Sequence, residues 1–188
     1  MMVRCFLAIE LPDGIRDYLY NLIIQLKKEL KEKRIKTKIN WVAKKNLHLT
    51  LKFFGDVNER EIKDIRGTIK GVKAERLNLS LDGFGVFPQE DYIRVLWIGL
   101  EPEEKIIKLQ QHLDETLLSL FPKEQRFSSH LTLGRVKFLS DKKAFLRLLK
   151  GFEIKRLEFE IDGFCLFESE LTKDGPRYKV LEKYASGQ

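Results

Sequence analysis

Two of the three histidines in this chain lie in identical surroundings. His48 and His130 each begin the sequence His-Leu-Thr-Leu, whereas His112 has no motif around it. In an extended strand alternate side chains share a face, so each motif histidine should point the same way as the threonine two positions later. The leucines between them should face the core. Each motif is therefore expected to present an imidazole and a hydroxyl together.

Two imidazoles that face one another suit a reaction that needs both an acid and a base. Histidine titrates near neutral pH, so a neutral imidazole can take a proton from an attacking water or hydroxyl while a protonated one donates to the leaving oxygen. The opening of a phosphodiester is such a reaction. Thr50 and Thr132 are candidates to hydrogen-bond the nonbridging phosphate oxygens, whose charge a nearby cation would stabilise.

Two cations that follow the motifs are candidates for this role. Lys52 should share a face with His48 by alternation, although a solvated strand lysine is an equally good interpretation. Arg135 falls on the leucine face if alternation from His130 is strict. A β-bulge or the end of the strand after Gly134 would have to turn it toward the site.

The motifs belong to a longer internal repeat. LDGFGVF at Leu81–Phe87 matches IDGFCLF at Ile161–Phe167, with nearly the same offset as the two histidines. A looser match sets RCFLAIELP, from Arg4, against RVLWIGLEP, from Arg94. No long Gly-, Ser- or Pro-rich linker separates the copies. We therefore expect a single bilobal domain over residues 1–188, with residues 1–90 approximately carrying the first motif and residues 91–188 the second.

Each half is predicted to contain a strand, a helix, the motif strand, a helix and a further strand. The predicted strands cover Val3–Glu10, Asn46–Phe54, Leu77–Phe87, Ile93–Leu100, Phe127–Val136, Phe152–Phe167 and Tyr178–Tyr184. The predicted helices run from Asp13 through Leu30, from an Asn58–Glu61 capping box through Val72, from Ile106 to near Phe121, and from a Ser140 cap through Leu149. The expected fold class is α+β, with two pseudo-symmetric lobes. Each lobe should be an antiparallel sheet with helices on its outer side, and the active-site cleft should lie between the sheets.

Composition limits the class of protein. Lys and Arg exceed Asp and Glu by 35 to 28, which fits an anionic partner. The lysine-rich run Lys27–Lys38 is interpreted as a solvated helix face, with guidance of RNA as the alternative. Cys5 and Cys165 lie far apart and suggest neither a zinc site nor a disulfide scaffold. We expect a soluble, cytoplasmic protein with no membrane association and no signal peptide, and a monomer as the simplest state.

The segments HLTLKFFG and HLTLGR, in their duplicated setting, resemble the RNA 2′,3′-cyclic phosphodiesterases of the 2H phosphoesterase superfamily, also called the 2′-5′ RNA ligase family. The resemblance covers almost the whole chain. It implies hydrolysis of a terminal 2′,3′-cyclic phosphate to a 2′-phosphate without metal or cofactor. It also implies His48 as proton donor to the 3′ leaving oxygen, His130 as proton acceptor from water, and Arg135 as a phosphate ligand. The implied partner is RNA with a cyclic phosphate end, tRNA fragments included.

Other functions remain open at this point. A 2′-5′ RNA ligase would use the same two histidines in the reverse direction, and a smaller cyclic nucleotide or an ADP-ribose cyclic phosphate would also suit them. A non-catalytic RNA-binding module would use the motifs only to hold phosphates. Aromatic side chains could stack a base or simply pack in the core; these candidates are Phe6, Phe54, Trp97 and Phe127.

Overall fold

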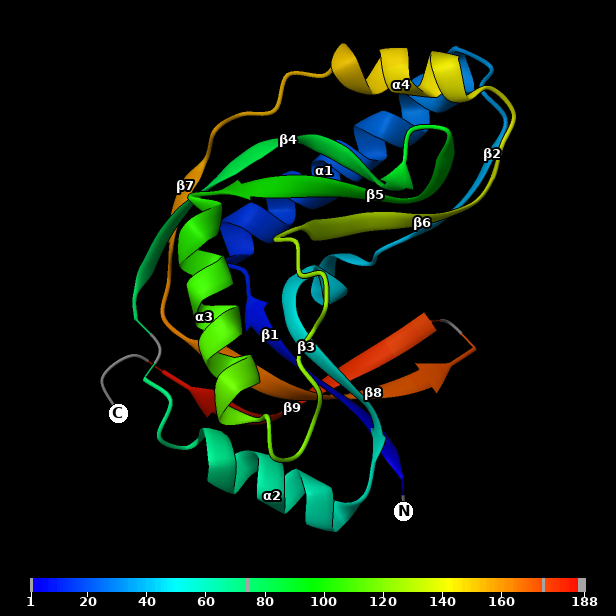
Figure 1. Ribbon diagram of the computed structural model, residues 1–188. Coiled ribbons are helices and arrows are strands. Elements are labelled where there is room, and N and C mark those ends of the chain that lie inside the picture. Colours follow the sequence, from blue (N-terminus) through cyan, green and yellow to red (C-terminus); the bar gives the residue numbers. More distant parts are fainter. Residues whose placement is uncertain (1, 74, 174, 186–188) are drawn as a thin grey trace.

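The computed structural model describes residues 2–73, 75–173 and 175–185 and has an α+β fold (Figure 1). Within these residues, four α helices accompany one antiparallel sheet of nine strands. The strands are β1 (Val3–Glu10), β2 (Thr37–Trp41), β3 (His48–Val57), β4 (Leu77–Gln89), β5 (Tyr92–Glu101), β6 (Leu131–Leu139), β7 (Glu158–Ile161), β8 (Phe164–Thr172) and β9 (Gly175–Tyr184). The helices are α1 (Asp13–Glu32), α2 (Glu59–Ile69), α3 (Glu103–Thr116) and α4 (Lys142–Lys150), and a 3-10 turn, η1, covers Lys44–Asn46.

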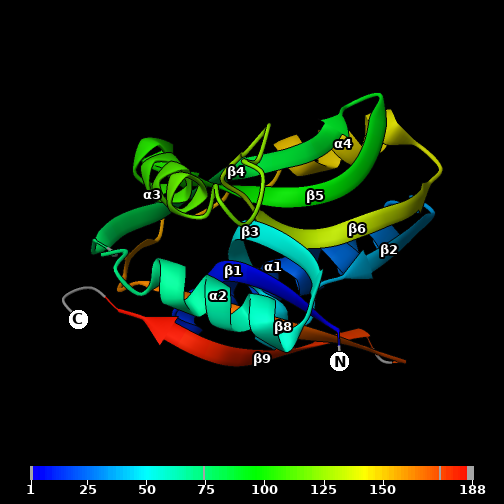
Figure 2. The same cartoon turned by 60° about the horizontal axis from the view of Figure 1, so that its bottom comes forward.

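The sheet has two parts that meet at the motif strands. Its order is β7-β4-β5-β6-β3-β1-β8-β9, and β2 pairs with the outer part of β6. The contact between β6 and β3 is confined to one register pair, Leu49 with Leu131. We call β3, β1, β8 and β9 the first half-sheet, and β7, β4, β5, β6 and β2 the second half-sheet. Figure 2 shows the first half-sheet below the second.

This arrangement corrects the expectation of two separate sheets, each formed by one half of the chain. The sheet is continuous, and the two halves of the sequence exchange strands. β4 precedes residue 90 but forms a hairpin with β5, in which Gln89 pairs with Tyr92. β8 and β9 come from the end of the chain but join β1 of the first half-sheet. β4 and β5 are close in sequence and pair through a tight turn, so this hairpin crosses the boundary between the two copies of the repeat.

The helices supply one face of a common core. Six apolar residues of α1 recur at helical spacing and are all buried; they are Ile15, Leu19, Leu22, Ile23, Leu26 and Leu30. In Figure 1 α1 passes behind β4 and β5, while α2 lies at the opposite end, beside the first half-sheet. Burial of one such leucine or isoleucine contributes about 1.5–3 kcal/mol, so the stripe on α1 holds this helix firmly against the sheet.

Several element boundaries differ from the predictions. The lysine-rich run is not one helix face, because α1 ends at Glu32 and β2 begins at Thr37. Asp141, and not Ser140, caps α4, since its carboxylate accepts a hydrogen bond from the amide of Ala144. α3 ends at Thr116, before the predicted Phe121, and β6 begins at Leu131 instead of Phe127. The capping box at the start of α2 is confirmed.

No helix in the described ranges has both the length and the apolar character needed to cross a membrane.

Candidate active site

The two motifs meet where β3 and β6 touch. Because the strands are antiparallel, the pairing of Leu49 with Leu131 directs His48 toward Thr132 and Thr50 toward His130. The paired leucines are fully buried, whereas all four polar side chains are half-buried. The prediction that leucines face the core and the imidazole and hydroxyl face outward is confirmed for both motifs. All four polar groups therefore gather on one face of the junction.

Both imidazoles are fixed by the same kind of hydrogen bond. Nδ1 of His48 donates to the carbonyl of Asn46 at 2.7 Å, and Nδ1 of His130 donates to the carbonyl of Ser128 at 2.8 Å. A carbonyl oxygen only accepts, so the hydrogen of each neutral ring resides on Nδ1 and Nε2 is left for chemistry. Nε2 of His48 lies 2.9 Å from the hydroxyl of Thr50.

Aromatic side chains surround His48. The Tyr178 ring meets the imidazole edge-on at 5.2 Å between centroids, and Phe6 lies 5.1 Å away. Phe6 was a candidate for base stacking, whereas Tyr178 was missed because it lies far away in sequence on β9. A hydrogen bond holds β9 next to the first motif, since the side-chain amide of Asn46 donates to the carbonyl of Pro176, at the start of β9.

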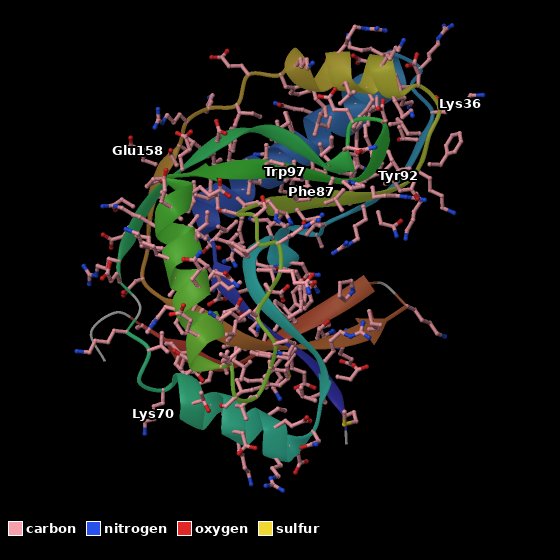
Figure 3. The ribbon with its side chains drawn as sticks, in the orientation of Figure 1. Lys36, Lys70, Phe87, Tyr92, Trp97 and Glu158 are labelled. Atoms are coloured by element: carbon pink, nitrogen blue, oxygen red, sulfur yellow. The ribbon has the colours of Figure 1, made fainter. Side chains whose placement is uncertain are left out.

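His130 has a similar environment on the second half-sheet. Phe87 meets its ring edge-on at 5.0 Å and stacks on Trp97, which lies 6.1 Å from His130 (Figure 3). Phe87 ends the repeated segment LDGFGVF, and that repetition was the available signal for it. Its counterpart in the other copy is Phe167, which stacks on Phe6 at 5.1 Å. The two imidazoles therefore sit beside pseudo-equivalent aromatic walls.

Burial and neighbouring charge both disfavour protonation of these imidazoles. Burial lowers the pKa of His48, and the charges of His130 and Arg135 lower it further, against the opposing effect of the Asn46 carbonyl. Burial also lowers the pKa of His130, again with a contribution from Arg135. Mutual electrostatic influence of this kind requires the three side chains to lie close together. With no anion bound, both imidazoles are held toward the neutral form.

Arg135 reaches this face through a β-bulge. On β5, Leu96 pairs with Gly134 and Trp97 with Thr132, so Leu133 is an extra residue on β6. The bulge resets the alternation: Leu133 and Gly134 are both buried, and Arg135 is exposed. The bulge expected near Gly134 is thus confirmed, and Arg135 exerts its charge on the His48, His130 and Tyr178 side chains.

An equivalent bulge removes Lys52 from the site. On β1, Leu7 pairs with Lys52 and Ala8 with Thr50, so Leu51 is the extra residue. The Lys52 side chain is only 2% exposed and donates to the Asp114 carboxylate and, at 2.8 Å, to the carbonyl of Pro122. The prediction that Lys52 shares a face with His48 is wrong, because it assumed unbroken alternation.

The bulge on β3 gives Phe53 the same position that the bulge on β6 gives Arg135. Phe53 is 57% exposed and lies 5.8 Å from Phe6. It was missed for the same reason that Lys52 was misplaced. Alignment of HLTLKF with HLTLGR sets Phe53 against Arg135, and this was the signal that could have found it. The face of the junction therefore carries one cation and one exposed aromatic ring at equivalent positions.

Two features of the surroundings bear on what the site can hold. A hollow on the second half-sheet is lined by Trp97, Ser128 and Ser129 among others, and Ser129 directly precedes His130. In the described part of the chain, no group of three or more His, Cys, Asp or Glu side chains is placed to hold a metal ion. The side chains gathered on this face are two imidazoles, two threonine hydroxyls and the Arg135 guanidinium.

Comparison with known proteins places this chain in a family. The model of the LigT-like phosphoesterase family matches twice, over residues 9–97 and 98–178, in agreement with the internal repeat. Curated relatives named RNA 2′,3′-cyclic phosphodiesterase include one from Methanocaldococcus jannaschii, 36% identical over 97% of this chain and all of the relative. Another, from Methanothermobacter thermautotrophicus, is 36% identical over 98% of this chain and 99% of its own length.

Solved structures agree with these relatives. A protein from Thermus thermophilus superimposes with a TM-score of 0.78 at 26% identity, over 98% of this chain and all of the other. Escherichia coli LigT in its apo form gives a TM-score of 0.74 at 25% identity, over 100% of this chain and 99% of the other. Because the family model spans most of the sequence and relatives exceed 30% identity over nearly its full length, this chain belongs to the LigT-like phosphoesterase family.

Proposed function

We propose that this protein hydrolyses the 2′,3′-cyclic phosphate at the end of an RNA to a 2′-phosphomonoester. The observation that carries the proposal is that the motif strands of His48 and His130 meet at the Leu49–Leu131 pair, and that Nδ1 of each imidazole is bonded to a backbone carbonyl, which leaves Nε2 as the nitrogen for acid–base chemistry. Relatives of up to 36% identity over nearly the full length carry the name of this activity.

The proposed reaction is an attack by water with two proton transfers. Nε2 of His130 takes a proton as the water oxygen forms its bond to phosphorus. The bond from phosphorus to the 3′ oxygen breaks, and the protonated Nε2 of His48 donates to that oxygen. The cyclic diester thereby becomes a 2′-phosphate and a free 3′ hydroxyl, and one proton has moved from His48 to His130 overall.

Three side chains are proposed to hold the phosphate. Arg135 supplies a fixed positive charge, and the hydroxyls of Thr50 and Thr132 donate to nonbridging oxygens. The bound anion also opposes the effect of Arg135 on the imidazoles, so it should raise the pKa of His48 toward the protonated state that the reaction needs. Binding of the substrate thus prepares the acid.

The site is proposed to lie in a cleft between the two half-sheets and to be complete within one chain. One motif, one imidazole and one threonine come from each half-sheet. No metal ion, cofactor or second subunit is required, because the acid, the base and the cation are side chains of the same molecule. The terminal base would rest on the aromatic cluster beside His48, where Phe53 is exposed.

The experiment is hydrolysis of a short RNA that ends in a 2′,3′-cyclic phosphate, with EDTA present and identification of the product isomer. The unaltered protein should form only the 2′-phosphate, and His48→Ala and His130→Ala should each reduce kcat by a factor of about 10²–10⁴. His112→Ala is the matched control, because His112 lies exposed on α3 and should not matter. Loss of activity with EDTA, or a 3′-phosphate product, would contradict the mechanism. Retained RNA binding without turnover would favour a ligase or a binding module.

A further inference from the structure

The site face of the second half-sheet continues beyond Arg135 onto β2. Asn40 pairs with Arg135, and Lys38 pairs with Phe138 after a shift in register. Alternation puts Lys38 and Asn40 on one face of β2, while Ile39 and Trp41 pack against the core. Cross-strand partners share a face, so Arg135 and Phe138 lie on the same face as Asn40 and Lys38. We call Lys36, Lys38, Asn40, Arg135 and Phe138 the β2–β6 strip.

The strip exposes groups that folding alone does not explain. The Phe138 ring is 54% exposed at a strand position where a polar residue would serve the fold better. Lys36 and Lys38 are exposed, and no ion pair within the described ranges involves either of them or Arg135. Unpaired cations beside an exposed aromatic ring are the combination that binds single-stranded nucleic acid, through phosphates and stacked bases.

The opposite end of the second half-sheet has the opposite charge. The hollow next to His130 is lined by acidic side chains, namely Asp82, Glu101, Glu103, Glu104, Glu158 and Glu160, with Arg156 as the opposing charge. In Figure 3 Glu158 lies at one end of this half-sheet and Lys36 at the other, with Trp97 and Phe87 between them. A polyanion that leaves the site is therefore repelled at the acidic end and attracted along the β2–β6 strip.

The first half-sheet is less suited to a phosphate backbone than the β2–β6 strip. Its site face carries a buried apolar cluster of Phe6, Ala8, Cys165 and Phe167. Two cations at its margins are already paired, Arg4 with Asp56 and Lys183 with Glu10. This face of the first half-sheet is better suited to stacking a nucleobase than to binding a series of phosphates.

We infer that the β2–β6 strip binds the RNA strand on the 5′ side of the reacting nucleotide. The inference rests on the proposed function, because a 2′,3′-cyclic phosphate is by definition a 3′ end and the rest of the RNA must leave on its 5′ side. Lys36 and Lys38 contact phosphates of that strand, and Phe138 stacks a base upstream of the terminal one. Alternate residues of a strand are about 6.8 Å apart, so the strip extends over more than one nucleotide. The substrate is accordingly an oligonucleotide, and a cyclic mononucleotide uses only part of the surface.

The test compares kcat/KM for a tetranucleotide with a cyclic phosphate end and for the matching 2′,3′-cyclic mononucleotide. The unaltered protein should prefer the tetranucleotide. Phe138→Ala should reduce that preference about fivefold or more, the equivalent of losing one stacked base. Lys36→Gln/Lys38→Gln should reduce it as well, and should lower the slope of log kcat/KM against log salt for the tetranucleotide by about 1.4. Lys63→Gln/Lys70→Gln is the matched control, because it removes the same charge from exposed positions on and beside α2, far from the strip (Figure 3).

The outcomes separate the inference from the proposed function. If both substrates are hydrolysed without a preference for the tetranucleotide, or if the strip variants retain that preference, the inference is overturned while the proposed function stands. If neither substrate is hydrolysed, the proposed function fails. Fluorescence polarisation of a labelled tetranucleotide with a 3′-terminal phosphate then tests the strip directly. Equal affinity of the unaltered protein and both strip variants would overturn the inference in that case too.

Discussion

Leu51 and Leu133 are the extra residues of two equivalent β-bulges, each three positions after a motif histidine. The side chains around them follow the same order of burial, from Leu49 to Phe53 and from Leu131 to Arg135. The same kind of bulge therefore has opposite effects on the charged side chain that follows each motif. It brings Arg135 to the imidazoles, and it buries Lys52 on the other side of the sheet.

The position of Arg135 predicts how the pH profile of the reaction responds to its removal. Burial first, and Arg135 in addition, keep the pKa of His130 below its ordinary value of 6.5, and the same causes act on His48. In the proposed reaction the productive free enzyme has one protonated and one neutral imidazole, so kcat/KM should be greatest on the acid side of pH 6.5.

Arg135→Gln removes a charge that lowers both pKa values, so the maximum should move to higher pH as the rate falls about 10²–10³-fold. Arg135→Lys keeps the charge and should leave the maximum where it was. The measurement is kcat/KM against pH with the cyclic mononucleotide, supported by NMR titration of the imidazole protons. An unmoved maximum in Arg135→Gln would show that the guanidinium does not act on the histidines.

The same two histidines should make the free protein less stable in acid. Their pKa values are lower when folded than when unfolded, so the unfolded chain binds more protons between the folded values and about 6.5. The free energy of unfolding should therefore fall as pH decreases below about 6.5. Urea unfolding at a series of pH values should show a shallower fall in His48→Gln/His130→Gln than in the unaltered protein. His112→Gln should retain the original slope.

How far the sequence predicts this site depends on where the chain keeps to regular alternation. The faces of His48 and His130 follow from alternation over three residues, and the buried stripe of α1 follows from helical spacing. Gly134 indicated a bulge because glycine permits an irregular backbone. The structure adds a second reason for glycine here, since Cγ2 of Ile39 would lie 2.7 Å from a Cβ added at this position. No glycine marks the equivalent bulge next to Lys52, which becomes visible only in the pairing of β3 with β1.

Other features depend on contacts between distant segments. Tyr178 lies beside His48 only because β9 closes the edge of the first half-sheet. β2 was hidden because it overlaps the end of the lysine-rich run Lys27–Lys38, and because its inward side chains, Ile39 and Trp41, are too few to show a strand by themselves. Pairing partners of this kind cannot be read from local periodicity.

Lys52 should be a determinant of stability and of the placement of His130. Its ammonium and the carboxylate of Asp114 are both buried, and Asp114 also accepts from Gln110 and from the amide of Glu124. This network ties the first motif strand to the segment that leads into the second motif. Lys52→Met leaves the carboxylate without its cation and should cost about 3–5 kcal/mol in the free energy of unfolding.

The double variant Lys52→Met/Asp114→Leu removes both charges and should be more stable than the single variant. Urea unfolding measures both. Burial tends to raise the pKa of Asp114, but hydrogen bonds from Lys52, Glu124 and Gln110 outweigh it and lower that pKa overall. The stabilising effect of the carboxylate is therefore present at neutral pH and lost as pH falls through the lowered value. A Lys52→Met protein as stable as the original would show that the pair contributes nothing.

Gly85 should be needed to keep the Trp97 and Phe87 rings in place beside His130. A Cβ added at Gly85 would lie 2.0 Å from the Trp97 ring, whereas a Cβ at Gly83 would meet nothing within 4 Å. Gly85→Ala should therefore displace Trp97 and, through their stacking, Phe87, at a cost of about 1–3 kcal/mol in stability. Because Phe87 packs on His130, kcat should fall as well. Gly83→Ala is the matched control on the same strand and should change neither quantity. Equal effects of the two substitutions on unfolding and on turnover would mean that β4 responds to any added methyl group, and that the Trp97–Phe87 wall does not position the imidazole.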